Sequence, residues 1–234
     1  IPALRARGHE IEIVAREKDV TSALLDQLGI AHHSVGRPSK AGRLGQLTEL
    51  IGRDLFLAQR ALRMRADVIV TRNPAGVQAA RLSGAVGIFD TDDGSAAGIH
   101  FRAARPFAHW ITSPACLPER WGPRHVQYPG YKQSAYLHPD VFTPDPRVLE
   151  DLGLSQDEPF FVARFVAMDA SHDAGESGMP LALKREVLER LQERGRVFLS
   201  CESGVPAEWA HLAYQLPAHR LHDLLAFASV FVGD

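Results

Sequence analysis

Short apolar stretches alternate with longer amphipathic ones through most of the chain, and this pattern predicts an α/β fold. In the first half, helices are expected at residues 21–30, 41–65, 75–84 and 95–107. The expected strands between them are EIEIVA, AHHSV, ADVIVT, VGIFD and HWITS, with ADVIVT buried. Strands that alternate with helices pair in parallel through right-handed crossovers, so we expect a doubly wound sheet with one ligand-binding edge.

A second series of strands and helices follows a break at residues 129–159. This segment holds five of the 15 prolines and little periodic apolar pattern, which is typical of a connection between domains. Beyond it, FFVARFV, RVFLSC and SVFVGD are expected as strands, separated by two amphipathic helices. The pattern therefore predicts two Rossmann-like domains that face a cleft, the first over residues 1–145 and the second over residues 146–234.

Both ends of the chain interrupt this pattern. The opening residues IPALRARG have the character of a helix end that Gly8 stops, and they lead directly into a strand. A helix that feeds a strand normally follows an earlier strand in a βαβ unit. We therefore expect a first strand ahead of this sequence, and a second domain that continues beyond Asp234.

Composition narrows the classes of protein that fit this fold. With 45% hydrophobic and 23% charged residues the chain is globular, and a net charge of −2 argues against a protein whose main task is binding nucleic acid. No apolar run approaches the roughly 20 residues that a membrane span needs. Two cysteines far apart favour reduced thiols, and a cytoplasmic location is expected.

The first candidate site is the loop in FFVARFVAMDASHDAGESGMP, where polar residues gather at the end of a predicted strand. An imidazole beside carboxylates can exchange a proton near neutral pH, which makes His172 a candidate general base with Asp169 or Asp173 as its orienting partner. Arg164 and Ser171 are candidates for substrate binding, Arg164 through a phosphate group. The alternative is a loop whose polar side chains cap the next helix.

A second candidate site combines FDTDDGS and TRNPAG, which also end predicted strands. Asp90, Asp92 and Asp93 can bind Mg²⁺ or the hydroxyl groups of a sugar, and a turn that caps the next helix is the alternative. Arg72 and Asn73 can contact an anionic or hydroxylated ligand, with the start of a helix as the plainer interpretation.

Two further features carry weaker signals. Tyr131 and Lys132 lie in the proline-rich connection, where a ligand contact and hinge packing both fit. His219 and His222 form a possible ligand pair or a helix start, and no metal site is expected because His172 has no second histidine at ligand spacing.

Basic residues around the long predicted helix suggest a further partner. They fit contact with an anionic membrane surface or, alternatively, a solvated helix face. These residues are Arg37, Lys40, Arg43, Arg53, Arg60, Arg63 and Arg65.

Several of these segments resemble a known family. RARGHEIEIVARE and HRLHDLLAFASVFVGD resemble parts of the nucleotide-sugar glycosyltransferases of the B-type two-domain fold. YPGYKQSAYL, together with FVARFVAMDASHDAGESG, resembles the bacterial and archaeal domain of unknown function number 354. The similarity departs at AMDASHDAG, which puts acidic residues where those enzymes usually have a glycine-rich phosphate-binding turn.

The resemblance implies an enzyme that transfers a sugar from a nucleotide donor in cell-envelope or polysaccharide synthesis. The donor would bind the second domain and a sugar or lipid-linked acceptor the first, with no cofactor beyond the nucleotide-sugar substrate. A sugar-nucleotide 2-epimerase is the related alternative. A module that binds a nucleotide sugar without turnover is the alternative from a different class, since a shared fold does not determine function.

Overall fold

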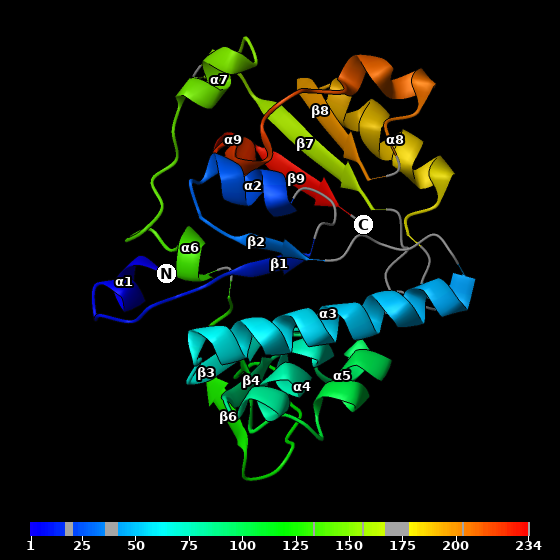
Figure 1. Ribbon diagram of the computed structural model, residues 1–234. Coiled ribbons are helices and arrows are strands. Elements are labelled where there is room, and N and C mark those ends of the chain that lie inside the picture. The colour runs from blue at the N-terminus through cyan, green and yellow to red at the C-terminus, as the bar shows by residue number, and fades with distance from the viewer. Residues whose placement is uncertain are drawn as a thin grey trace. The chain divides into compact units, whose positions relative to one another are not determined.

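The computed structural model describes residues 1–16, 21–35, 42–132, 134–155, 157–166, 178–202 and 204–233, with side chains of residues 42–50 excepted. Its contacts divide the chain into two units, Ile1–Ser134 and Ala135–Asp234, and each is described by itself. Every strand pair in the described residues is parallel, and helices lie between most consecutive strands, although none lies between β5 and β6 (Figure 1). The predicted α/β class with parallel sheets is therefore confirmed.

The first unit contains a two-stranded sheet, β1-β2, and a four-stranded sheet of order β3-β4-β5-β6. Its strands are β1 (Val14–Arg16), β2 (His33–Val35), β3 (Val68–Thr71), β4 (Val86–Asp90), β5 (Trp110–Pro114) and β6 (His125–Tyr128). Its helices are α1 (Pro2–Arg5), α2 (Thr21–Gln27), α3 (Gly42–Met64), α4 (Pro74–Ser83) and α5 (Ile99–Ala104), with a 3₁₀ turn η1 (Gly94–Ala97). Strand β6 was not among the predicted strands.

Helix α4 shows how local sequence sets an element. The Asn73 side chain accepts a hydrogen bond from the amide of Ala75 at 3.1 Å, and Pro74 occupies the first turn, where its missing N–H costs nothing. Gly84 ends the helix with φ +80°, a left-handed conformation that favours glycine. Gly76 allows the helix to approach β3, because an added Cβ would lie 2.6 Å from Thr71 Oγ1.

The hydrophobic core of the first unit lies between the four-stranded sheet and its helices. Phe89 from β4 and Ile111 from β5 pack against residues from α4 and α5, among them Val77 and Phe101. The prediction that ADVIVT is buried is wrong for part of β3. Val68 and Val70 are 50% and 66% exposed, because the described residues leave that side of the strand uncovered.

The second unit is a three-stranded sheet of order β8-β7-β9 with helices around it. Its strands are β7 (Phe160–Phe165), β8 (Arg196–Cys201) and β9 (Val230–Gly233). Its helices are α6 (Ser134–Leu137, which begins at the unit boundary), α7 (Arg147–Asp151), α8 (Leu181–Gln192) and α9 (Leu221–Phe227), with 3₁₀ turns at Ala207–Leu212 and Ala218–Arg220. Buried residues form one cluster with α8, through Leu188, and another with α7 and α9, through Leu149 and Leu224.

Contacts place α7 and the segment before it in the second unit. Val148 and Leu149 pack in the same core as Phe160 and Leu224. The division between units, at Ser134, falls within the connection expected over residues 129–159.

A charged network holds the segment before α7 against α9. Asp145 accepts bonds from Arg147 Nη2 at 2.6 Å and Arg220 Nη1 at 2.7 Å, and its amide donates to the buried carboxylate of Asp223 at 2.9 Å. The hydrogen bond from Arg147, followed by that from Arg220, lowers the pKa of Asp145 well below its usual value. The carboxylate form of Asp145 is therefore stabilised in the folded unit.

This network predicts acid sensitivity of the second unit. Because the folded pKa of Asp145 is depressed, its stabilising contribution is fully present above the unfolded pKa of about 4 and is lost as pH falls below it. Denaturant unfolding at a series of pH values should show Asp145→Asn less stable than the parent at pH 6, with a smaller loss below pH 4. Asp140→Asn, at a carboxylate with 86% of its side chain exposed, is the matched control, and an equal effect there would contradict the assignment.

Candidate active site

Four neighbouring strands of the first unit bring polar residues to one edge. The register pairs Thr71 with Phe89, Asp90 with Thr112, and Pro114 with Tyr128, so the carboxyl ends of β3, β4, β5 and β6 lie side by side. Ligands of parallel α/β sheets bind outside this edge.

Five charged residues gather here, and we call them the charged cluster: Arg72, Asp90, Asp92, Asp93 and Lys132. The Lys132 ammonium lies 2.8 Å from Asp90 Oδ2 and 3.4 Å from Asp92 Oδ1. Arg72 Nη2 contacts the same oxygen of Asp92 and lies 3.2 Å from Asp93 Oδ2. Cations and carboxylates therefore alternate, which reduces the repulsion between adjacent aspartates.

Uncharged groups from β5 and β6 complete the cluster. Thr112 Oγ1 donates to Asp90 Oδ1 at 2.8 Å, which leaves Asp90 with a partner on each carboxylate oxygen. Burial, and then the carboxylates of Asp90 and Asp92, raise the pKa of the Tyr128 phenol, so Tyr128 is a hydroxyl donor at neutral pH. Thr112 and Tyr128 were not among the residues predicted to form a site. Their position near the carboxyl ends of β5 and β6 could have identified them as site residues, but Tyr128 could not be placed in this way because β6 was not predicted.

Partial burial makes the cluster suited to binding. The Asp90, Asp92 and Lys132 side chains are only 19%, 20% and 24% exposed. Ion pairs that are partly withdrawn from water are stronger than exposed ones and are less screened by salt. Carboxylate oxygens accept hydrogen bonds from hydroxyl groups, and the two cations donate to hydroxyl or phosphate oxygens. The arrangement can therefore bind a ligand rich in hydroxyl groups.

Helix capping does not account for the aspartates. The turn η1 after β4 is capped by Thr91, whose Oγ1 accepts from the amide of Gly94 at 3.0 Å. Asp93 stands directly before η1, but its side chain makes no capping bond. Asp90 and Asp92 instead make ion pairs. Within the described part of the chain, no group of three His, Cys, Asp or Glu residues is placed to hold a metal ion.

Asn73 and Tyr131 lie apart from these ion pairs. The side-chain oxygen of Asn73 caps α4, which supports the helix-start interpretation of TRNPAG. Tyr131 is exposed, and a hydrogen bond with Cys116 raises the pKa of its phenol. In the connection it is therefore Lys132, rather than Tyr131, that contacts Asp90 and Asp92.

Of the residues predicted to form the site in the second unit, the structure describes Arg164, which lies on the strand before the loop. Asp169, Ser171, His172 and Asp173 lie outside the described residues, so their predicted roles stay predictions. Arg164, in β7, donates through Nη2 to Glu202 Oε1 at 2.7 Å, just beyond the end of β8. The Arg164 side chain is 42% exposed, so it also faces solvent.

Two arginines of the long helix α3 do not simply face solvent, as the solvated-face interpretation of its basic residues had suggested. Arg53 is buried, and Arg60 donates through Nη2 to Glu12 Oε1 at 2.5 Å, which ties α3 to the segment before β1. In the second unit, the His222 ring packs against Tyr136 with ring centres 5.7 Å apart. His222 thus has an aromatic packing partner near the start of α9.

Comparison with solved structures shows two glycosyltransferases similar to this chain. The MurG structure from Acinetobacter baumannii aligns with a TM-score of 0.45 and 14% identity, over 91% of this chain and 63% of that one. A glycosyltransferase from Rickettsia africae aligns with a TM-score of 0.46 and 14% identity, over 99% of this chain and 62% of that one. The chain thus spans less than two thirds of the length of both structures.

No family model matches the chain and no curated protein matches it by sequence, so the resemblance to domain of unknown function number 354 stays a prediction. Among the helices that the structure describes, none has both the length and the apolar character needed to cross a membrane.

Proposed function

We propose that this protein is a nucleotide-sugar-dependent glycosyltransferase whose first unit binds the acceptor at the charged cluster. The observation that supports this most directly is the alternation of Arg72, Asp92, Lys132 and Asp90 at the carboxyl edge of a parallel sheet. A sugar presents several hydroxyl groups that both donate and accept hydrogen bonds. Paired carboxylates and cations offer matching acceptors and donors.

In this proposal the groups of the charged cluster bind and orient the acceptor. Asp90 and Asp92 accept hydrogen bonds from its hydroxyl groups, and Lys132 holds the two carboxylates at their present spacing. Arg72, which is the most exposed member, is available to a phosphate group of the acceptor. Orientation of an acceptor hydroxyl lowers the barrier to transfer, because the entropy of positioning is lost on binding rather than in the reaction.

The second unit would supply the donor site and the proton acceptor. His172 is proposed as the general base that takes the proton from the acceptor hydroxyl, with Asp169 or Asp173 orienting its ring. Ser171 and Arg164 are proposed donor contacts. Arg164 already pairs with Glu202, so phosphate binding would have to compete with that carboxylate.

The test begins with a thermal-shift screen of the protein against a panel of nucleotide sugars, since a ligand that binds the native state raises the melting temperature. Donors that stabilise the protein are then incubated with sugar and lipid-linked acceptors, and release of nucleoside diphosphate is measured. Acceptor-dependent release is the expected result. Binding without release would instead identify a binding module, and isomerisation of the sugar without an acceptor would identify an epimerase.

A further inference from the structure

The turn that carries Asp92 and Asp93 is fixed at both of its ends. Ahead of the aspartates, the amide of Thr91 donates to the carbonyl of Thr112 at 2.9 Å, and Thr91 is only 3% exposed. Behind them, the amide of Gly94 donates to Thr91 Oγ1 at 3.0 Å. The distance of both carboxylates from the cations of the charged cluster therefore depends on how firmly these two ends are held.

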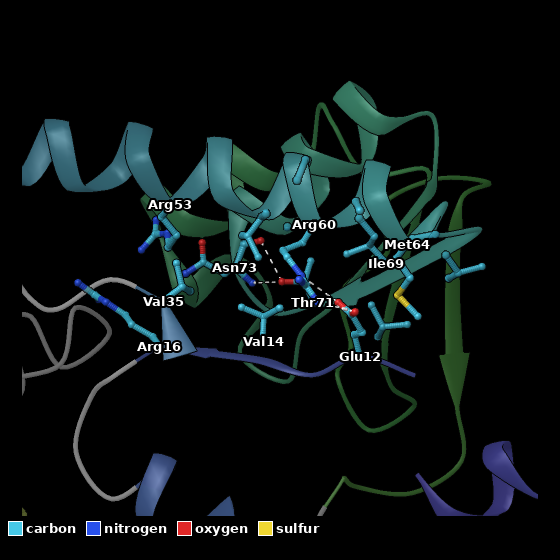
Figure 2. Close-up of a pocket in the computed structure, with 17 residues that line it drawn as sticks. Glu12, Val14, Arg16, Val35, Arg53, Arg60, Met64, Ile69, Thr71 and Asn73 are labelled. Carbon is cyan, nitrogen blue, oxygen red and sulfur yellow. Dashed lines mark hydrogen bonds and ion pairs between the residues drawn. The ribbon is translucent and has the colours of Figure 1, made fainter. Parts of the chain in front are cut away.

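The neighbouring turn, which carries Arg72, is held by the residues on either side of it. Thr71 Oγ1 accepts a hydrogen bond from the amide of Asn73 at 2.9 Å and donates to its carbonyl at 3.2 Å (Figure 2). The side chain of Asn73 in turn caps α4. Residues adjacent in the sequence are therefore sufficient to fix the backbone of Arg72.

The aspartate-bearing turn has a further partner from far along the chain. Glu119, between β5 and β6, accepts from the amide of Ser95 through Oε2 at 3.0 Å, and its Oε1 accepts from the Ser95 hydroxyl. Gly94 has φ +57°, and an added Cβ there would clash with Oε2 of Glu119, so glycine permits this close approach. Both carboxylate oxygens of Glu119 thus bind the end of the turn that carries Asp92 and Asp93.

The segment that carries Glu119 is itself anchored. Gln127, in β6, donates through Nε2 to the carbonyl of Leu117 at 2.7 Å. Trp121 packs against Phe101 of the hydrophobic core, with ring centres 4.7 Å apart. The carboxylate of Glu119 is therefore presented to the turn from a fixed support.

The charge of Glu119 is directed to this turn alone within the part of the chain that the structure describes. Its carboxylate bonds are those from Ser95, and it forms no ion pair with a described cation. Hydrogen bonds to an ionised carboxylate are stronger than those between neutral groups. Glu119 therefore restrains Ser95 more firmly than a neutral acceptor would.

We propose that Glu119 is a positioning residue of the acceptor site, and that it sets the place of Asp92 and Asp93 through Ser95. The inference rests on the proposed function, because the acceptor is taken to bind at the charged cluster. Without Glu119, the amide and hydroxyl of Ser95 bond to water and the turn gains conformational freedom. Acceptor binding must then restrict that freedom, which lowers the affinity without changing the transfer step.

Nuclear magnetic resonance relaxation tests the restraint without any substrate. In Glu119→Ala, the order parameters of the Asp92 and Asp93 amides should fall from about 0.85 to below about 0.6, the values of rigid and flexible backbone. The matched control is Glu10→Ala, at an exposed glutamate of the same unit, which should leave them unchanged. A folded Glu119→Ala protein in which both amides stay rigid would overturn the proposal.

Steady-state kinetics tests the effect on the acceptor. Glu119→Ala should raise the KM for the acceptor roughly tenfold, with kcat and the KM for the donor unchanged, because hydrogen bonds to a charged group contribute about that factor. Glu119→Gln keeps one acceptor oxygen for Ser95 and should recover part of the affinity. An equal loss in kcat, or no recovery in Glu119→Gln, would contradict a positioning role.

A double-mutant cycle shows whether Glu119 acts through Asp92. In the Asp92→Asn background, Glu119→Ala should raise the KM for the acceptor much less than in the parent, since residues that act through one another are not additive. Equal rises in both backgrounds would overturn the proposal. If circular dichroism shows Glu119→Ala unfolded, Ser95→Ala, which removes one of the two bonds from the other side, replaces it and should raise the KM roughly threefold.

The relaxation and kinetic results together separate the two proposals. A turn that loosens in Glu119→Ala, in a protein whose parent shows no acceptor-dependent release of nucleoside diphosphate, would reject the proposed function and retain Glu119 as the residue that holds the turn. A turn that stays rigid in an active Glu119→Ala enzyme would reject the positioning role alone.

Discussion

Replacing Lys132 with methionine is expected to raise the KM for the acceptor roughly tenfold, because the partly buried carboxylates that would receive the acceptor lose their cation, and about 1.4 kcal/mol is tenfold in affinity. The physical reason is the position of the ammonium between Asp90 and Asp92. Without it, two adjacent carboxylates repel each other and lose the spacing that would receive the acceptor. Steady-state kinetics of nucleoside diphosphate release, with the acceptor varied, measures this effect.

Two controls separate this effect from general damage. Lys184→Met makes the same change on α8 in the second unit and should leave the KM for the acceptor unchanged. Lys132→Arg retains the charge and should recover part of the affinity. A folded Lys132→Met variant with unchanged KM and kcat would show that the charged cluster is structural.

Replacing Leu224 with alanine is expected to destabilise the second unit by about 2 to 5 kcal/mol, since removal of a buried leucine side chain loses its transfer free energy and leaves a cavity. Leu224 is fully buried in the cluster that joins α9 to α7 and β7, where it packs with Val148 and Phe160. Denaturant unfolding followed by circular dichroism gives the change in free energy of unfolding.

The matched control is Leu181→Ala, the same chemical change at the start of α8, where the side chain is 58% exposed. Surface substitutions of this kind usually change stability by no more than about 0.5 kcal/mol. Equal effects of Leu224→Ala and Leu181→Ala would contradict the assignment of residues after Ala135 to a common core with α9.

Elements with a long, regular apolar pattern could be predicted from the sequence. The helix expected over residues 41–65 is observed as Gly42–Met64, because its apolar positions repeat at helical spacing over six turns or so. Short elements were harder. Strand β1 was expected from Glu10 and begins at Val14, since alternation alone does not show where a strand's pairing partner begins. Strand β6 has only four residues, too few for its alternation to be distinguished.

The burial of β3 was mispredicted for a different reason. ADVIVT has the continuous apolar composition of a strand covered on both faces. In the structure Val68 and Val70 line an open cavity. Composition records which environment a strand suits, whereas exposure depends on which neighbours are present.

Part of the candidate site could also be anticipated. The parallel topology placed Asp90, Asp92 and Arg72 at one edge of the sheet, and the structure brings them into one cluster with Lys132. Their pairing could not be predicted, because Lys132 lies about 40 residues along the chain from both aspartates and only the fold brings them together. Thr112 and Tyr128 were missed because their contribution depends on strand register.

Acceptor binding at the charged cluster is tested most directly by a methyl NMR titration of the protein with the acceptor that supports nucleoside diphosphate release. The Thr112 methyl group lies beside the hydroxyl that donates to Asp90, so it reports ligand contact at the charged cluster. We expect a saturable shift of this methyl resonance, with no shift at Val197 in the core of the second unit. Saturable binding of the acceptor with no change at Thr112 would contradict the assignment of the charged cluster as the acceptor site.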